Sequence, residues 1–149
     1  MNEKNISIGQ KVGENTSSKP FNPLTLKSFN LNPDEARLLL NIALMAIGGN
    51  RFRSAAKILA VLEEFRPNHP SVAVAKTVAL MSAGEFEAAV AYVEGEALRK
   101  FPDSAMLRAF LGMALVHLGR MNEAKPVLLS AAESKDAAAA KMAGDLLKS

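Results

Sequence analysis

The sequence predicts an all-α protein, a superhelix of three helix pairs with a C-terminal capping helix and a flexible N-terminal tail. Three observations lead to this prediction. Helix start and stop signals follow one another through residues 34–149, the turns between helices recur every 34 or 35 residues, and no segment shows the apolar–polar alternation of a strand. With 149 residues, of which 49% are hydrophobic, the chain has enough apolar material for the core of one domain.

Residues 1–33 differ in composition from the remainder of the chain. They are rich in Asn, Ser, Lys and Gly, whereas every alanine lies after them. We therefore expect a flexible polar tail over residues 1–33 and a helical repeat domain over residues 34–149. A short anchor that docks on the domain is the alternative for four apolar tail residues, Phe21, Leu24, Leu26 and Phe29. The N-terminus lacks the apolar stretch of a secretory signal, so we expect a cytoplasmic protein.

The first helix is expected over residues 34–47. Asn32 is a suitable N-cap, Pro33 suits the first helical position, and Gly48 and Gly49 stop the helix. The same reasoning predicts helices over residues 51–65, 70–83, 85–100, 104–118, 121–133 and 136–147.

The glycines and prolines between these helices recur at a fixed interval. Gly49, Gly84 and Gly119 are 35 residues apart, and so are Pro67 and Pro102. Each unit is therefore a helix, a glycine turn, a second helix and a turn with proline, and it buries its apolar faces by stacking on its neighbours. The apolar side of the last predicted helix caps the third unit.

Residues 34–134 resemble the tetratricopeptide repeat, a family with a period of about 34 residues. In the third unit, the residues that carry this resemblance are Leu111, Gly112, Leu115, Gly119, Ala124, Leu128 and Ala131. The sequence departs from the family pattern at Lys76, where an apolar residue is expected, and at Glu94-Gly95-Glu96, which adds one residue to the second unit. The resemblance implies that the first helix of each pair lines the concave side.

The residues that catalysis or metal binding require are not arranged in any known motif. His69 and His117 are the only histidines, there is no cysteine, and no serine has a supporting nucleophile motif. We therefore expect no enzyme activity, no metal and no cofactor. The net charge of +3 is too small for a nucleic-acid-binding footprint, and no apolar run is long enough to insert into a membrane.

The predicted first helices are almost free of charge. Residues 36–48, 71–83 and 105–118 carry three charged side chains in total, whereas the second helices carry sixteen. Apolar residues recur on the first helices at steps of three and four, so they form parallel ridges along one groove. The predicted groove residues are Leu40, Leu44, Ile47, Val74, Val78, Met81, Met106, Ala109, Met113, Val116 and His117. The alternative is that these side chains form the core of a closed bundle.

An apolar groove favours a narrower resemblance, to the needle-subunit chaperone of bacterial type III secretion. It is carried by LLNIAL at 39–44, ALMSAGEFEAA at 79–89 and AESKD at 132–136. The resemblance implies that the groove holds the amphipathic C-terminal helix of a needle protein and prevents premature polymerisation, with a second small helical co-chaperone in a heterodimer or heterotrimer. The alternatives are a chaperone of translocator proteins, which the N-terminal tail favours, and a general scaffold for protein–protein interaction.

Overall fold

The computed structural model describes residues 30–149, and every regular element among them is a helix. The first pair is α3 (Pro33–Gly48) and α4 (Phe52–Phe65). The second pair begins with α5 (Pro70–Ser82) and continues as α6 (Phe86–Tyr92), the π-helical turn η1 (Val93–Ala97) and α7 (Leu98–Lys100). The third pair is α8 (Ala105–His117) and α9 (Met121–Ala132), and α10 (Ala137–Lys148) follows.

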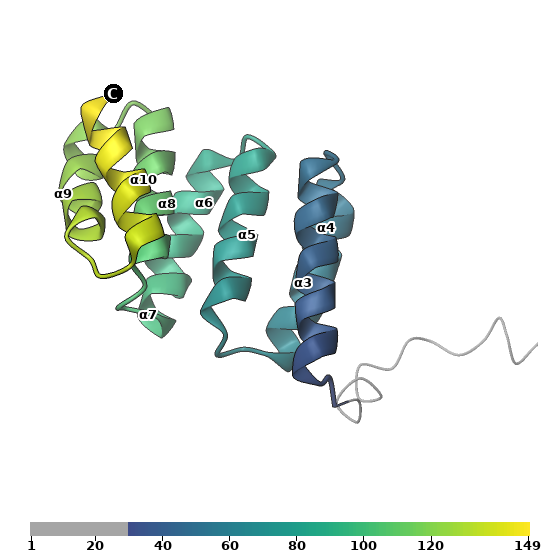
Figure 1. Ribbon diagram of the computed structural model, residues 1–149. Helices are drawn as coiled ribbons and strands as arrows, with labels where there is room; N and C mark the ends of the chain where they lie inside the picture. Colours follow the sequence, from purple (N-terminus) through teal and green to yellow (C-terminus); the bar gives the residue numbers. More distant parts are fainter. Residues whose placement is uncertain (1–29) are drawn as a thin grey trace, which may run out of the picture. The chain divides into compact units, whose positions relative to one another are not determined.

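The helices follow one another side by side in chain order, and α10 packs on α8 and α9 (Figure 1). The predicted fold class, a superhelix of three helix pairs with a C-terminal capping helix, is confirmed. The predicted tail lies outside the described residues up to residue 29, and so do the anchor candidates Phe21, Leu24, Leu26 and Phe29.

The start of α3 follows from its sequence. The Asn32 side chain accepts hydrogen bonds from the backbone N–H groups of Asp34 and Glu35, at 3.0 and 2.9 Å. The Glu35 carboxylate accepts one in return from the Asn32 N–H at 3.0 Å. This capping box, with Pro33 in the first turn, satisfies donors that a helix N-terminus otherwise leaves unpaired.

The turn between the two helices of a pair has the same backbone structure in all three pairs. In the first turn, however, the residue equivalent to Gly84 and Gly119 is not the predicted one. Gly84 and Gly119 have φ of 79° and 72°, and the left-handed residue of the first turn is Asn50, with φ of 57°. Gly49 has φ of −91°. Asn50, not Gly49, is therefore the equivalent of the two glycines, because glycine and asparagine are the residues that tolerate this conformation best.

The extra residue of the second pair forms the π-helical turn η1. A π turn arises when one residue is inserted into an α-helix. Val93 and Ala97 remain fully buried at its two ends, and Glu94, Gly95 and Glu96 between them are exposed. The insertion is therefore accommodated on the solvent side of the helix, and the buried face of the second pair is preserved.

The main core lies in the second and third pairs and α10. α8 and α9 approach each other so closely that a Cβ at Gly112 would overlap the Leu128 side chain. The buried members of this core are Ala73, Ala89, Val90, Val93, Ala97, Ala105, Leu107, Ala109, Leu111, Ala114, Leu115, Ala124, Leu128, Ala131, Ala139 and Ala143.

The first pair has buried residues of its own that are not part of the main core. Ala43 and Ala55 are fully buried where α3 and α4 meet, and Leu59 and Leu62 of α4 are each 1% exposed. α5 is in contact with α3 and α4 as well as with α6 and α8. It is therefore the helix that joins the first pair to the rest of the stack.

Candidate functional site

The first helices of the three pairs enclose an apolar hollow of about 400 Å³. Leu40 and Leu44 of α3 and Val74 and Val78 of α5 form its walls, and Met106 of α8 closes it. We call this site the α3–α5–α8 groove. Its other lining residues are Pro70, Ser71, Ala75, Ser104 and Asp136.

The structure brings together five of the eleven predicted groove residues and separates the others. Met113 lines a different hollow with Met142 and Leu146 of α10, because the capping helix packs beside this part of α8. Met81 and Val116 are partly buried and pack against the main core. In this part of the stack, Met113 of α8 faces α10 and Val116 packs against the core, so neither side chain lines the groove.

Two of the predicted groove residues are buried in the chain itself. Ala109 is 0% exposed and belongs to the main core, and Ile47 is 6% exposed. The expectation that they line an open groove is therefore corrected. Their helical spacing is right, but the two side chains fill space between neighbouring helices.

The side chain of His117 has a partner within the chain. Its ring stacks on Phe86, with 4.6 Å between the ring centroids and an interplanar angle of 17°. This contact joins the C-terminal end of α8 to the N-terminal end of α6. It gives His117 a structural role, and contact with a partner stays a prediction.

Lys76, the departure from the family pattern in α5, points away from the groove. Its Nζ lies 2.9 Å from the Glu63 carboxylate of α4 and 4.3 Å from the centroid of the Tyr92 ring. Burial raises the pKa of the Tyr92 hydroxyl, and the nearby carboxylates of Glu63 and Glu96 raise it further. This charged cluster joins the first and second pairs and leaves the groove side of α5 apolar.

Asp136 is the one ionisable residue in the lining of the α3–α5–α8 groove. Its carboxylate caps α10, because it accepts hydrogen bonds from the N–H groups of Ala138 and Ala139, both at 3.1 Å. The groove therefore has a lining of aliphatic and thioether side chains, small polar groups and one carboxylate already engaged in a helix cap.

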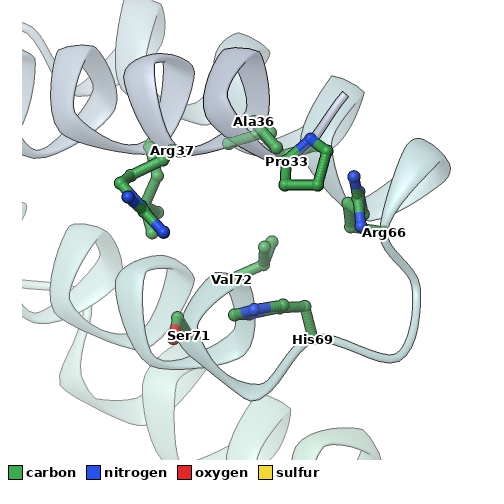
Figure 2. A pocket seen from close by; sticks show the side chains of 9 residues that line it. Pro33, Ala36, Arg37, Arg66, His69, Ser71 and Val72 are labelled. Carbon is green, nitrogen blue, oxygen red and sulfur yellow. The ribbon is translucent and has the colours of Figure 1, made fainter. Parts of the chain in front are cut away.

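A second hollow, of about 270 Å³, was not predicted from the sequence. We call it the basic pocket. It is lined by Pro33, Ala36, Arg37, Leu40, Leu62, Arg66, His69, Ser71 and Val72 (Figure 2). Three separate segments supply its basic side chains, so periodicity within one helix does not reveal it. The available sequence signal is that Arg37 lies one helical turn before Leu40.

Neither a metal centre nor a membrane-spanning helix is found in the described part of the chain. Residues 30–149 contain no group of three or more His, Asp or Glu side chains placed to hold a metal ion. None of their helices combines the length and the apolar character that crossing a bilayer requires.

The family model of the tetratricopeptide repeat matches residues 80–146, which include the third pair and most of α10. Residues 80–146 are therefore similar to tetratricopeptide repeats. The first helix pair, outside the match, has the same tetratricopeptide-like arrangement of two helices joined by a left-handed turn. Tetratricopeptide repeats are scaffolds for protein–protein interaction, and stacked repeats provide extended binding surfaces. A comparison with functionally curated proteins finds no match.

Proposed function

We propose that this tetratricopeptide-repeat protein is a non-catalytic chaperone that binds an amphipathic helix in the α3–α5–α8 groove. The observation that carries the proposal is the groove itself, in which Leu40, Leu44, Val74, Val78 and Met106 from three helices line one hollow. An amphipathic helix presents apolar side chains at three- and four-residue steps, which suits a groove of this kind. The thioether of Met106 adapts to the shape of such a partner.

Following the resemblance of three sequence segments, we propose the needle subunit of a bacterial type III secretion system as the partner. A needle subunit polymerises by burying its amphipathic helix against copies of itself. A groove that occupies the same face competes with the polymer. We place this complex in the cytoplasm, with a second small helical co-chaperone as its third member.

The free energy gained by burying apolar side chains in the groove is large enough to hold such a complex together. Each large apolar side chain that becomes fully buried contributes about 1.5–3 kcal/mol. The loss of rotational and translational freedom on association opposes much of this gain. Three or four anchor residues on the partner helix are therefore needed for a stable complex.

The test places charges in the groove and compares them with charges on the face of α3 that points away from the groove. Leu44→Glu combined with Val78→Glu puts two carboxylates into the lining. We expect binding of the needle subunit, co-expressed with this chain, to weaken by about 100-fold or more, because two apolar contacts are lost. Light scattering of the purified complex and titration calorimetry measure the change.

The control is Ile42→Glu combined with Met45→Glu. Ile42 and Met45 are 41% and 76% exposed, and they lie on the face of α3 away from Leu40 and Leu44. The control carries the same added charge and should bind normally. Equal binding by both double variants, or equal loss in both, contradicts the proposed site.

A further inference from the structure

We propose that the basic pocket binds a carboxylate of the helix held in the α3–α5–α8 groove, so that the partner is recognised by an acidic group next to its apolar face. The proposal rests on the proposed function, which it deepens by naming the chemistry of the partner. It also assigns a role to Arg37, the single charged residue of α3 beyond the first turn.

The pocket brings basic side chains together without an acidic residue in its lining. Arg37 comes from α3, Arg66 follows the last residue of α4, and His69 precedes α5. Figure 2 shows the guanidinium of Arg37 and the ring of His69 directed into the same open space, with Arg66 at one side. The Arg37 guanidinium gives the hollow a positive charge, and the imidazole of His69 adds a hydrogen-bond donor.

Within residues 30–149, the Arg37 guanidinium forms no ion pair and no hydrogen bond. Other arginines in this part of the chain have such partners. Arg120 is bonded to Glu123 at 2.7 Å, and Arg108 donates to the carbonyl of Pro102. A planar guanidinium in a concave site is suited to bidentate binding of a carboxylate.

The basic pocket and the groove adjoin each other. Leu40 and Ser71 line both hollows. Arg37 and Leu40 are three residues apart on α3, and their side chains therefore lie one turn apart on the same face. A helix that places an apolar side chain against Leu40 thus brings a carboxylate one turn away within reach of Arg37.

The start of α5 adds to the attraction for a negative group. His69 is the N-cap of α5 and provides no side-chain hydrogen bond to it, and the first turn of α5 contains no acidic residue. The positive end of this 13-residue helix is therefore not compensated by the chain's own side chains. Its field adds to that of the Arg37 guanidinium, which reaches the same hollow from α3 (Figure 2).

The remaining lining favours a carboxylate on a protein over a strongly hydrated anion. Pro33, Ala36, Leu62 and Val72 make much of the wall apolar. Such a wall accommodates the methylene groups of a glutamate side chain or the last residue of a peptide. Both sources offer the same carboxylate chemistry, so the experiment separates them.

The experiment uses the full chain and four synthetic amphipathic peptides with one apolar stripe. One peptide carries Glu one turn before the stripe, and its match carries Gln. Each is made with a free and with an amidated C-terminus, and affinities are measured by titration calorimetry at low salt. We expect the Glu peptide to bind about tenfold more tightly than the Gln peptide, the scale of one charge-assisted hydrogen bond.

If the terminal group is the one recognised, amidation causes this loss and the Glu-to-Gln change does not. Arg37→Gln should abolish whichever difference is found. Arg99→Gln removes one positive charge at an exposed position of α7, and this control variant should preserve the difference in affinity. An unchanged difference in Arg37→Gln, or no dependence on either carboxylate, overturns the proposal.

An acetate titration followed by NMR makes the basic pocket testable without the groove. Acetate should shift the Arg37 side-chain signals in the full chain, and phosphate should shift them less. If all four peptides fail to bind but acetate shifts these signals, the groove proposal fails and the pocket remains an anion site. Absence of any shift with acetate, or a stronger effect of phosphate, contradicts carboxylate recognition.

Discussion

α3 and α8 are each the first helix of a pair, and beyond the first turn each carries one charged residue, Arg37 or Arg108. The apolar side chains of the two helices nevertheless differ in how far they are buried. Leu107, Leu111 and Leu115 of α8 are at most 3% exposed, whereas Leu38, Ile42, Leu44 and Met45 of α3 are 41–76% exposed. α8 contacts α5, α6, α9 and α10, whereas α3 contacts α4 and α5. In a repeat stack, burial therefore depends on the number of neighbouring helices more than on composition.

The largest expected effect comes from truncating a leucine in either region. Leu128→Ala in α9 and Leu59→Ala in α4 remove the same atoms from sites that are 0% and 1% exposed. Each should lower the free energy of unfolding by about 2–5 kcal/mol. Leu128 belongs to the main core and Leu59 does not. Leu59→Ala should therefore accelerate amide hydrogen exchange in α3 and α4 while α8 and α9 remain protected.

Leu128→Ala, in contrast, should accelerate exchange through α8, α9 and α10. Amide exchange followed residue by residue by NMR distinguishes the two variants. If Leu59→Ala accelerates exchange equally in all helices, the first pair and the main core unfold as one unit, and the contrast between the two regions does not extend to stability.

A smaller effect is expected at the turns of the two regions. Gly119→Ala places a Cβ on a residue with φ of 72°, which should lower the free energy of unfolding by about 1–2 kcal/mol. Gly49→Ala should change it by less than about 0.5 kcal/mol, because Gly49 has φ of −91° and the nearest atom to an added Cβ is 3.5 Å away. Chemical denaturation measures both, and equal losses would contradict the assignment of Asn50 as the left-handed residue.

The smallest effect concerns the junction of the first two pairs at high pH. The raised pKa of Tyr92 means that the unfolded chain loses its phenolic proton at lower pH than the folded protein. The contribution of Tyr92 to the free energy of unfolding should therefore be constant below pH 10, the ordinary tyrosine value, and decrease as the pH rises above it. Tyr92→Phe should remove this decrease.

Tyr92 is the one tyrosine of a chain without tryptophan, so tyrosinate absorbance reports its ionisation alone. Glu63→Gln should move the midpoint of this titration down towards the ordinary value. A midpoint already at the ordinary value in the unsubstituted protein would show that the first and second pairs do not enclose the Tyr92 hydroxyl.

The sequence predicted the helices well because the signals that determine them are local. α3 was expected over residues 34–47 and extends from Pro33 to Gly48, and the capping residues lie where the pattern placed them. The equivalence of Gly49 with the later glycines was wrong, because residue spacing does not show which residue of a turn has positive φ. The backbone hydrogen bonds of the turns do show it. The N–H of Arg51 donates to the carbonyl of Ala46, in the same way that the N–H of Glu85 donates to Leu80 and that of Arg120 donates to Leu115.

The candidate site was predicted less completely, since it depends on how the helices pack. Periodicity identified the helix faces that carry Leu40, Leu44, Val74 and Val78, and these line one groove. It did not show that α10 packs beside Met113, or that Ala109 fills the space between helices. Nor did it bring Arg37, Arg66 and His69 together, because their proximity depends on three segments that share no repeat position.

The π-helical turn at Val93–Ala97 has a consequence for how this repeat can vary in length. A residue added to an ordinary α-helix rotates everything after it by about 100° around the helix axis. Here the widened turn absorbs that rotation, so Leu98 and Phe101 still pack against the main core. The second helix of a pair can thus tolerate an inserted residue at a solvent-facing position, because the residues after the insertion still present the same face to the core. Length variation among such repeats is therefore compatible with an unchanged interior.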